Sequence, residues 1–364
     1  MDRLLDATLQ HLRALVGFDT RNPPRAIGED GIFDYLRAQL PGFDVRVGDH
    51  GAGAVSLFAT RGTPKLLFNV HLDTVPDSPQ WSASPFELRV TDDRAIGLGA
   101  CDIKGAAAAL LAVANASSGD IALLFTTDEE GADPRCIRTF LEHKPAFDGV
   151  LVAEPTHCKA VLAHRGIQSA CARFAGRAGH ASGEQKPADN ALHQAVRWSH
   201  AALEFADSQA QQHFGGLHGL RFNLGRIEGG IKANMIAPSA EVRFGMRPLP
   251  SMGMDRLLEQ LRAMVEHAPA EFRETFRGPP LPADTVNADA RQHDARALAD
   301  ALDIPVGEAV DFWTEAALFS QAGYTTFVFG PGDIAQAHSA DEWVALEQLE
   351  TVAARYLRML EKTR

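Results

Sequence analysis

Hydrophobic positions in the first 160 residues follow two different spacings. Apolar residues recur at helical spacing in three segments, 4–16, 32–40 and 105–117. Continuous apolar runs, typical of buried strands, occupy three other segments, 65–70, 120–127 and 149–154. Strands that alternate with helices predict an α/β layer: a mixed, mostly parallel sheet with helices on both faces.

The pattern changes from about Arg165. Three segments alternate apolar and polar positions as half-exposed strands do, namely 168–180, 219–230 and 239–249. Two segments between or after them have helical spacing, 191–206 and 254–268. Three or four such strands with two helices predict a small α+β layer, and the α/β pattern resumes after residue 284. We therefore predict a catalytic domain of residues 1–164 and 278–364, with a smaller domain of residues 165–277 inserted into it.

Length and charge narrow the possible functions. A chain of 364 residues exceeds the size at which one hydrophobic core usually stops growing, which agrees with two domains. The formal net charge of −12 argues against nucleic acid or an anionic membrane as the main partner. The four scattered cysteines form no C-x-x-C motif, and the start of the chain lacks the apolar core of a signal peptide. We expect a soluble, cytoplasmic protein.

Acidic residues and histidines stand at the ends of predicted strands. They are His71, Asp73, Asp102, Glu129, Glu130, Glu154 and His338. Taken singly, each has an ordinary explanation: the two adjacent glutamates could lie in a solvated loop, and Asp102 could cap a helix. In an open α/β sheet, however, ligands gather at the carboxyl ends of the strands. Imidazole nitrogens and carboxylate oxygens are ligands that zinc accepts, so the sequence predicts a site for two metal ions.

Several motifs, spread over nearly the whole chain, resemble those of a known protein family. They include HLDTVP, GLGACDIKG, TTDEEG, VAEPT, GRAGHAS and GPGDIAQAHSADEW. In these motifs the chain resembles the cocatalytic-zinc aminoacylases and peptidases, which include acetylornithine deacetylase, succinyl-diaminopimelate desuccinylase and the carboxypeptidase-G-type enzymes. The motifs EPT, TEA followed by GPG, and QAH favour the acetylornithine deacetylase branch. The resemblance implies a zinc-peptidase-like fold whose inserted domain serves as a lid and a dimerisation surface.

The resemblance also implies a set of metal ligands. His71 and Glu154 would bind one ion, Glu130 and His338 would bind the other, and Asp102 would bridge the two. A cis peptide bond that does not involve proline is implied after Asp102. The ions expected from the resemblance are Zn²⁺ or Co²⁺, one or two per subunit. The chain departs from the family pattern in two ways: Cys101 precedes the bridging aspartate where other members vary, and the chain is slightly short for the branch. Neither departure removes a ligand.

Further residues acquire roles from the same resemblance. Glu129 would be the general base, and Asp73 would accept the free imidazole N–H of His71. His180 would reach into the active site of a partner subunit, which implies a homodimer formed through the inserted domain. Three further assignments concern the substrate's carboxylate or the developing oxyanion, namely Asn234, Arg247 and Gly332.

The activity implied is hydrolysis of the N-acetyl amide of an α-amino acid in arginine biosynthesis. N-acetyl-L-citrulline is the expected substrate, and N-acetyl-L-ornithine is the alternative. Two other classes remain open: a dinuclear-metal dipeptidase or carboxypeptidase, and a non-catalytic binding protein on the same fold. The presence of Glu129 and of a full ligand set argues against the last of these.

Overall fold

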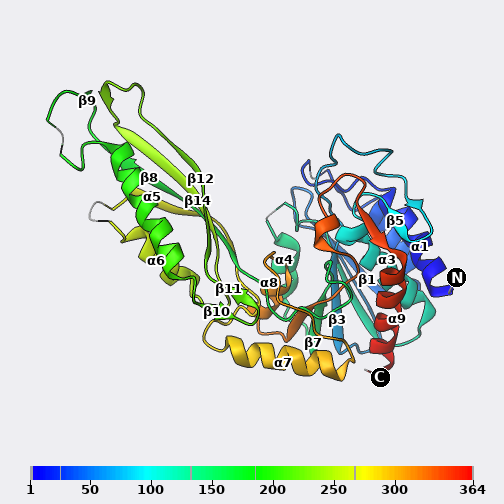
Figure 1. Ribbon diagram of the computed structural model, residues 1–364. Helices are drawn as coiled ribbons and strands as arrows, with labels where there is room; N and C mark the ends of the chain where they lie inside the picture. The colour runs from blue at the N-terminus through cyan, green and yellow to red at the C-terminus, as the bar shows by residue number, and fades with distance from the viewer. Residues whose placement is uncertain (1–2, 25, 132, 185, 266–267, 363–364) are drawn as a thin grey trace. The chain divides into compact units, whose positions relative to one another are not determined.

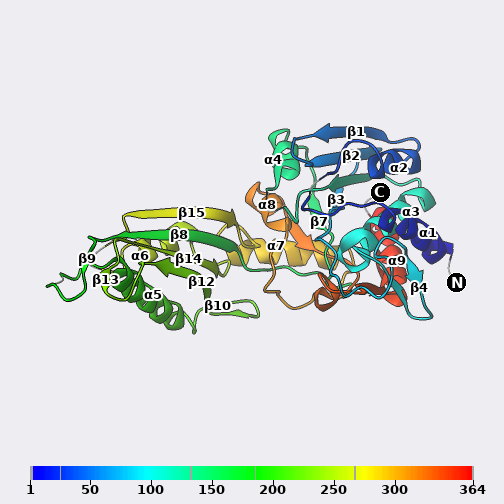
Figure 2. The ribbon, with the colours of Figure 1, turned by 90° about the horizontal axis from the view of Figure 1, so that it is seen from above.

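The computed structural model describes residues 3–24, 26–131, 133–184, 186–265 and 268–362. The chain divides into two compact units (Figures 1 and 2). Unit 1 comprises Met1–Leu162, Ala290–Gly307 and Thr314–Arg364, and unit 2 comprises Ala163–Asp289 and Glu308–Trp313. Unit 2 therefore interrupts unit 1 in the sequence.

A six-stranded sheet forms the centre of unit 1. Its order is β1-β2-β6-β3-β7-β16, in which the last four strands run parallel and β1 and β2 are antiparallel at one edge. Strands β3, β6 and β7 are buried at every position, which explains their continuous apolar sequences. The mostly parallel sheet is thus confirmed. The strands are β1 (Asp44–Asp49), β2 (Val55–Arg61), β3 (Leu66–His71), β6 (Ile121–Thr126), β7 (Gly149–Val152) and β16 (Thr326–Val328).

Helices cover both faces of this sheet, as predicted. Figure 1 shows α1, α3 and α9 together on one side and α4 and α8 on the other. Helix α3 consists almost entirely of alanine and leucine and is buried along most of its length, because small side chains let it pack closely between the sheet and its neighbours. The helices are α1 (Arg3–Val16), α2 (Ile32–Gln39), α3 (Gly105–Ala116), α4 (Arg135–Glu142), α7 (Ala288–Ala301), α8 (Ala316–Gln321) and α9 (Leu346–Lys362).

Short elements complete unit 1. A three-stranded sheet in the order β17-β5-β4 lies beside the segment that leads into α3. This segment, η1 (Ala100–Lys104), is a distorted helical turn that contains non-helical backbone angles at Asp102 and Ile103. The remaining elements are β4 (Arg89–Val90), β5 (Arg94–Ile96), η2 (Ile334–Gln336) and β17 (Trp343–Ala345).

Unit 2 is an α+β layer. Its four-stranded antiparallel sheet has the order β12-β14-β8-β15 (Figure 2). Helix α5 packs on the sheet through Trp198, whose Nε1 donates to the backbone oxygen of Leu261 in α6 at 2.7 Å. The opposite face carries exposed ion pairs such as Arg173–Glu241. The elements are β8 (Ile167–Ala175), β9 (Gly179–His180), α5 (Ala191–Ser208), β10 (His213–Phe214), β11 (Leu217–His218), β12 (Arg221–Gly229), β13 (Met235–Ile236), β14 (Ser239–Arg247), α6 (Met254–Arg262) and β15 (Glu271–Gly278).

One sequence expectation in unit 2 needs correction. The helix expected over 254–268 ends at Arg262, and residues 266–267 of that range lie outside the described residues. Strand β15 was not singled out by the apolar pattern, because it exposes most of its side chains at the edge of the sheet. Across the residues that the structure describes, no helix has the length and apolar character needed to cross a membrane.

Candidate metal centre

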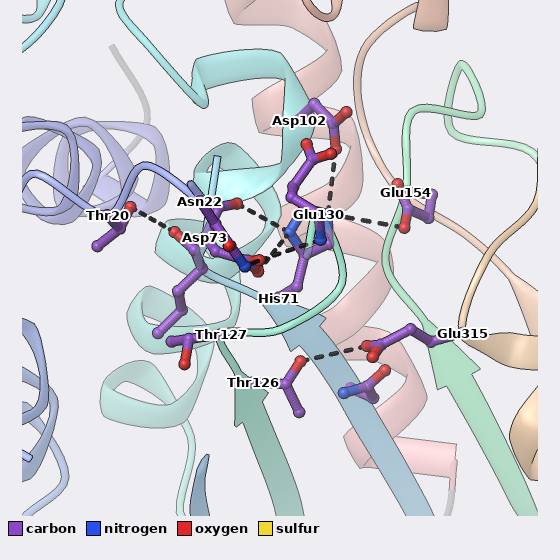
Figure 3. A network of polar contacts seen from close by, with 12 residues as sticks. Thr20, Asn22, His71, Asp73, Asp102, Thr126, Thr127, Glu130, Glu154 and Glu315 are labelled. Atoms are coloured by element: carbon purple, nitrogen blue, oxygen red, sulfur yellow. Dashed lines mark hydrogen bonds and ion pairs between the residues drawn. The ribbon is translucent and has the colours of Figure 1, made fainter. Parts of the chain in front are cut away.

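A first group of possible metal ligands gathers where two neighbouring parallel strands end. His71 is the last residue of β3, and its Nε2 lies 3.2 Å from Oδ1 of Asp102 and 3.7 Å from Oε1 of Glu154. Glu154 follows β7, which pairs with β3 in parallel, so both side chains come to the same edge of the sheet. All three residues are buried, and Figure 3 shows Asp102 and Glu154 pointing toward the His71 ring.

A second group shares Asp102 with the first. Its Oδ2 lies 3.3 Å from Nε2 of His338, and that nitrogen lies 3.0 Å from Oε1 of Glu130. Glu130 comes from the loop after β6, the other parallel neighbour of β3. The His338 side chain is 52% exposed whereas that of His71 is only 2% exposed, so the second group opens to solvent. Each group places one ligand atom per residue within 4.8 Å of the others.

The structure thus brings together all five residues expected to bind metal. Each group combines one imidazole with carboxylates, a donor set that suits a borderline divalent cation. The carboxylate that the groups share offers one oxygen to each histidine, as a bridging ligand would. The cis peptide bond expected after Asp102 is also present, between Asp102 and Ile103.

Asp73 orients the first histidine. Nδ1 of His71 lies 3.0 Å from the backbone oxygen of Asp73 and 3.4 Å from its Oδ1, which turns Nε2 toward the other ligands. Oδ2 of Asp73 accepts hydrogen bonds from Nδ2 of Asn22, at 2.8 Å, and from the backbone N–H of Glu130, at 3.0 Å. Asp73 therefore connects the ends of β3 and β6. Asn22 was not predicted, because it lies 51 residues from Asp73 in the chain.

The electrostatics of the centre favour the binding of cations. Burial raises the pKa of Glu129 to about 8, and the nearby carboxylates add to this rise. Burial likewise raises the pKa of Glu130 and Glu154. The imidazole of His338, bonded to Asp102 and Glu130, has its pKa raised to about 11. Like charges are costly so close together, and divalent cations among these side chains would remove that cost.

A second feature near the first group is a buried carboxylate that was not predicted. Glu315, in the TEA motif, is 1% exposed, and its Oε2 accepts a hydrogen bond from Oγ1 of Thr126 at 3.2 Å (Figure 3). Burial raises its pKa well above the usual range, and the charges of Asp128 and Glu129 act in the same direction. Nothing in a linear sequence distinguishes such a buried glutamate from an exposed one.

Gly332 contacts the segment that carries the shared aspartate. Its φ is +97°, and a Cβ at this position would lie 2.6 Å from Sγ of Cys101. Its N–H donates to Oε1 of Gln348 at 2.5 Å. Only glycine fits this close approach in this backbone conformation.

Three other candidate residues belong to unit 2, whereas the ligands belong to unit 1. His180 is exposed on β9, which pairs with β13. The N–H of the next residue, Ala181, donates to the backbone oxygen of Asn234 at 3.0 Å, so His180 and Asn234 are close neighbours. Arg247 ends β14 and is half-buried, which lowers its pKa. It lines a pocket on unit 2 together with Arg221.

The fold and the two ligand groups define the class of protein. A mostly parallel α/β sheet with paired imidazoles and carboxylates at the carboxyl ends of its strands is typical of a metal-dependent hydrolase. The chain belongs to the peptidase family M20/M25/M40, whose sequence profile matches residues 67–362. Enzymes of this family use one or two divalent metal ions. The family resemblance predicted from the motifs is confirmed.

Comparisons with known proteins place the chain more finely. It is 66% identical over 352 residues to an N-acetyl-L-citrulline deacetylase from Xanthomonas campestris pv. campestris, which covers 96% of both chains. It is 30% identical over 328 residues to an acetylornithine deacetylase from Vibrio vulnificus, which covers 85% of this chain and 84% of that one. The crystal structure of an aminopeptidase, PepT, from Bacillus cereus has the same fold, with a TM-score of 0.73 and 18% identity over 99% of this chain and 98% of that one.

Proposed function

We propose that this protein is a metal-dependent amidohydrolase that removes the acetyl group from N-acetyl-L-citrulline. The observation that carries the proposal is the 66% identity to an N-acetyl-L-citrulline deacetylase across 96% of both chains. The similarity to acetylornithine deacetylases is much lower, at 30% for the Vibrio vulnificus protein, so N-acetyl-L-ornithine is the second candidate. The relatives' names also support a place in arginine biosynthesis, and with it a cytoplasmic location.

We assign His71 and Glu154 to one ion, Glu130 and His338 to the other, and Asp102 to both. The ligand distances support this assignment, since each oxygen of Asp102 faces a different imidazole at 3.2 or 3.3 Å. Zn²⁺ and Co²⁺ both accept mixed nitrogen and oxygen ligands, so either ion suits the site. When bound, such ions lower the pKa of a water molecule and polarise the amide carbonyl.

Glu129 handles the protons of the reaction. It adjoins Glu130 in the loop after β6 and is half-buried beside the ligand groups. The carboxylate takes a proton from the attacking water as the oxygen bonds to the acetyl carbon, and it returns that proton to the nitrogen as the C–N bond breaks. The second proton of the water passes from the acetyl oxygen to the amine, so the products are acetate and the amino acid with a protonated amino group. Asp73 contributes by holding His71 in one orientation.

Unit 2 supplies substrate contacts in this proposal. Arg247 offers a planar guanidinium that suits an α-carboxylate, and between described residues it forms no ion pair with a carboxylate. We assign Asn234, and Gly332 of unit 1, to the same task of holding the substrate's carboxylate or the developing oxyanion. The short strand β9 exposes His180, which supports a role for its imidazole at a partner subunit's active site.

We also propose that the inserted domain of residues 165–277 is a lid and the dimerisation surface of a homodimer. Large apolar side chains are exposed on α5 and around β12 of unit 2, among them Val196 at 57%, Ile227 at 44% and Ile231 at 69%. Exposed apolar side chains of this size favour a surface that a partner covers.

The test is acetate release from N-acetyl-L-citrulline and N-acetyl-L-ornithine, measured side by side with zinc- or cobalt-loaded enzyme. Dipeptides are included in the same panel, and each assay is repeated after chelation. We expect faster turnover of the citrulline compound and loss of turnover without metal. Faster turnover of the ornithine compound would make the protein an acetylornithine deacetylase. Hydrolysis of dipeptides alone would make it a dipeptidase on the same metal centre.

A further inference from the structure

A buried carboxylate, Glu342, holds the segment that carries Asp102. Glu342 is 2% exposed. Its Oε1 accepts hydrogen bonds from the backbone N–H groups of Cys101, at 2.8 Å, and Asp102, at 2.9 Å. Its Oε2 accepts from the N–H of Gly99 at 3.0 Å, and its backbone oxygen accepts from the N–H of Gly97 at the same distance. One residue therefore binds four backbone N–H groups of residues 97–102.

Burying a carboxylate is energetically unfavourable, so a residue that only filled space would not need one. An isolated buried carboxylate costs several kcal/mol, and an apolar side chain of similar volume often packs at lower cost. Three hydrogen bonds from backbone N–H groups to one carboxylate offset that cost only if the segment adopts this conformation. The ammonium of Lys104 is also fully buried, interacts electrostatically with Glu342, and donates to the Phe18 oxygen at 3.0 Å. The segment thus lies close to a buried carboxylate and carries a buried ammonium.

The segment needs a fixed conformation because Asp102 faces two imidazoles at once. Its Oδ1 lies 3.2 Å from Nε2 of His71, and its Oδ2 lies 3.3 Å from Nε2 of His338. A small rotation of the backbone at Asp102 would move one oxygen away from its partner. Glu342 binds the N–H of this same residue and follows His338 by four positions, so it links the segments of two ligands.

We propose that Glu342 is a positioning residue that fixes Asp102 relative to His338, so that two ions can share one carboxylate. The inference rests on the metal function proposed above. Residues that orient metal ligands without touching the metal typically contribute 10- to 100-fold to metal affinity or activity. The hydrogen bonds to Glu342 hold the segment in the conformation that a shared ligand needs.

The neighbouring Asp341 provides a matched control. Its Oδ1 accepts hydrogen bonds from the N–H and Oγ of Ser82, at 3.2 and 2.9 Å, and from Arg89 at 2.5 Å. Its carboxylate thus binds a backbone N–H as Glu342 does, but on a different segment. Asp341 has a positive φ of 55°, which asparagine tolerates as well as aspartate does.

The test compares Glu342→Gln, Asp341→Asn and the unchanged enzyme. In Glu342→Gln one oxygen becomes an amino group that faces a backbone N–H, so at least one of the three hydrogen bonds is lost. After chelation, each protein is titrated with Co²⁺ by calorimetry, and the visible absorption of bound Co²⁺ is recorded. We expect Glu342→Gln to bind Co²⁺ about 10- to 100-fold more weakly, with an altered spectrum and a lower kcat at similar KM. Asp341→Asn should match the unchanged enzyme.

The outcomes separate this inference from the proposed function. A folded Glu342→Gln that binds two Co²⁺ ions with unchanged affinity and spectrum would overturn the positioning role, even if its thermal stability fell. An unchanged enzyme that binds no Co²⁺ would instead overturn the metal function. If Glu342→Gln does not fold, hydrogen exchange of peptides spanning residues 97–104 in the unchanged, metal-free enzyme decides. Slow exchange there supports the inference, and fast exchange contradicts it.

Discussion

Removing the metal ions should destabilise unit 1, and variants of the ligands should show whether the two ions share Asp102. An ion present at 100 times its Kd stabilises the folded state by about 2.7 kcal/mol, so two ions contribute roughly 5 kcal/mol. In a cooperative unit of about 150–250 residues, each kcal/mol shifts Tm by about 2–4 °C, so chelation should lower Tm by about 10–20 °C.

Two variants should change the metal-dependent increment in Tm by different amounts. His338→Ala removes a ligand from the solvent-exposed group only, so it should keep about half of the increment produced by two ions. Asp102→Asn removes the charge of the ligand that both groups share, so it should lose nearly all of it. The His338 side chain is 52% exposed, so its removal leaves no large cavity to confuse the comparison.

Thermal unfolding, recorded with a chelator and again with excess Zn²⁺ or Co²⁺, gives the increment for each protein. Because each variant is compared with its own metal-free form, changes in intrinsic stability cancel. The reasoning would be refuted if His338→Ala kept the full increment, or if Asp102→Asn kept as much as His338→Ala. The first result would mean that His338 holds no ion, and the second would mean that the two groups do not share Asp102.

Three further predictions concern protons, packing and subunits. In the ion-free protein the pKa of His338 is raised to about 11 and that of Glu129 to about 8, so both side chains hold protons at pH 7. Metal binding should therefore release protons, and metal affinity should fall as the pH falls. Calorimetric heats of metal binding that do not depend on the buffer's ionisation enthalpy would contradict this prediction. Gly332→Ala should lower stability by about 1–3 kcal/mol in urea unfolding, since its Cβ would lie 2.6 Å from Sγ of Cys101, and an unchanged midpoint would count against the close packing. Mixing inactive His180→Ala with inactive Glu129→Gln should restore part of the activity through hybrid dimers, and no recovery after subunit exchange would refute a role for His180 across subunits.

The parts of the centre that lie next to buried strands could be predicted from the sequence. His71, Glu130 and Glu154 each follow a continuous apolar run, and parallel strands bring their carboxyl ends together. His338 follows a short turn rather than a strand, and it meets Glu130 across 208 residues. It was expected at the end of a strand, so its place at the centre was predicted but its local structure was not.

The supporting residues could not be predicted, because their partners are distant in the chain. Asn22 bonds to Asp73 across 51 residues, and Glu342 bonds to Asp102 across 240. No local spacing identifies such pairs. Strands β1 and β15 were missed for a different reason: they are edge strands with many exposed charged residues, so the apolar pattern is weak.

The most direct test of the account is acetate release from N-acetyl-L-citrulline by the unchanged enzyme and by Glu129→Gln, each loaded with metal and analysed for its metal content. Glu129 is not among the assigned ligands, so the variant should bind the same number of ions as the unchanged enzyme. We expect its turnover to fall by about 10²- to 10⁴-fold, because it lacks the group that moves the proton. A variant with full metal content and full turnover would contradict that role, and an unchanged, metal-loaded enzyme that releases no acetate would contradict the proposed function.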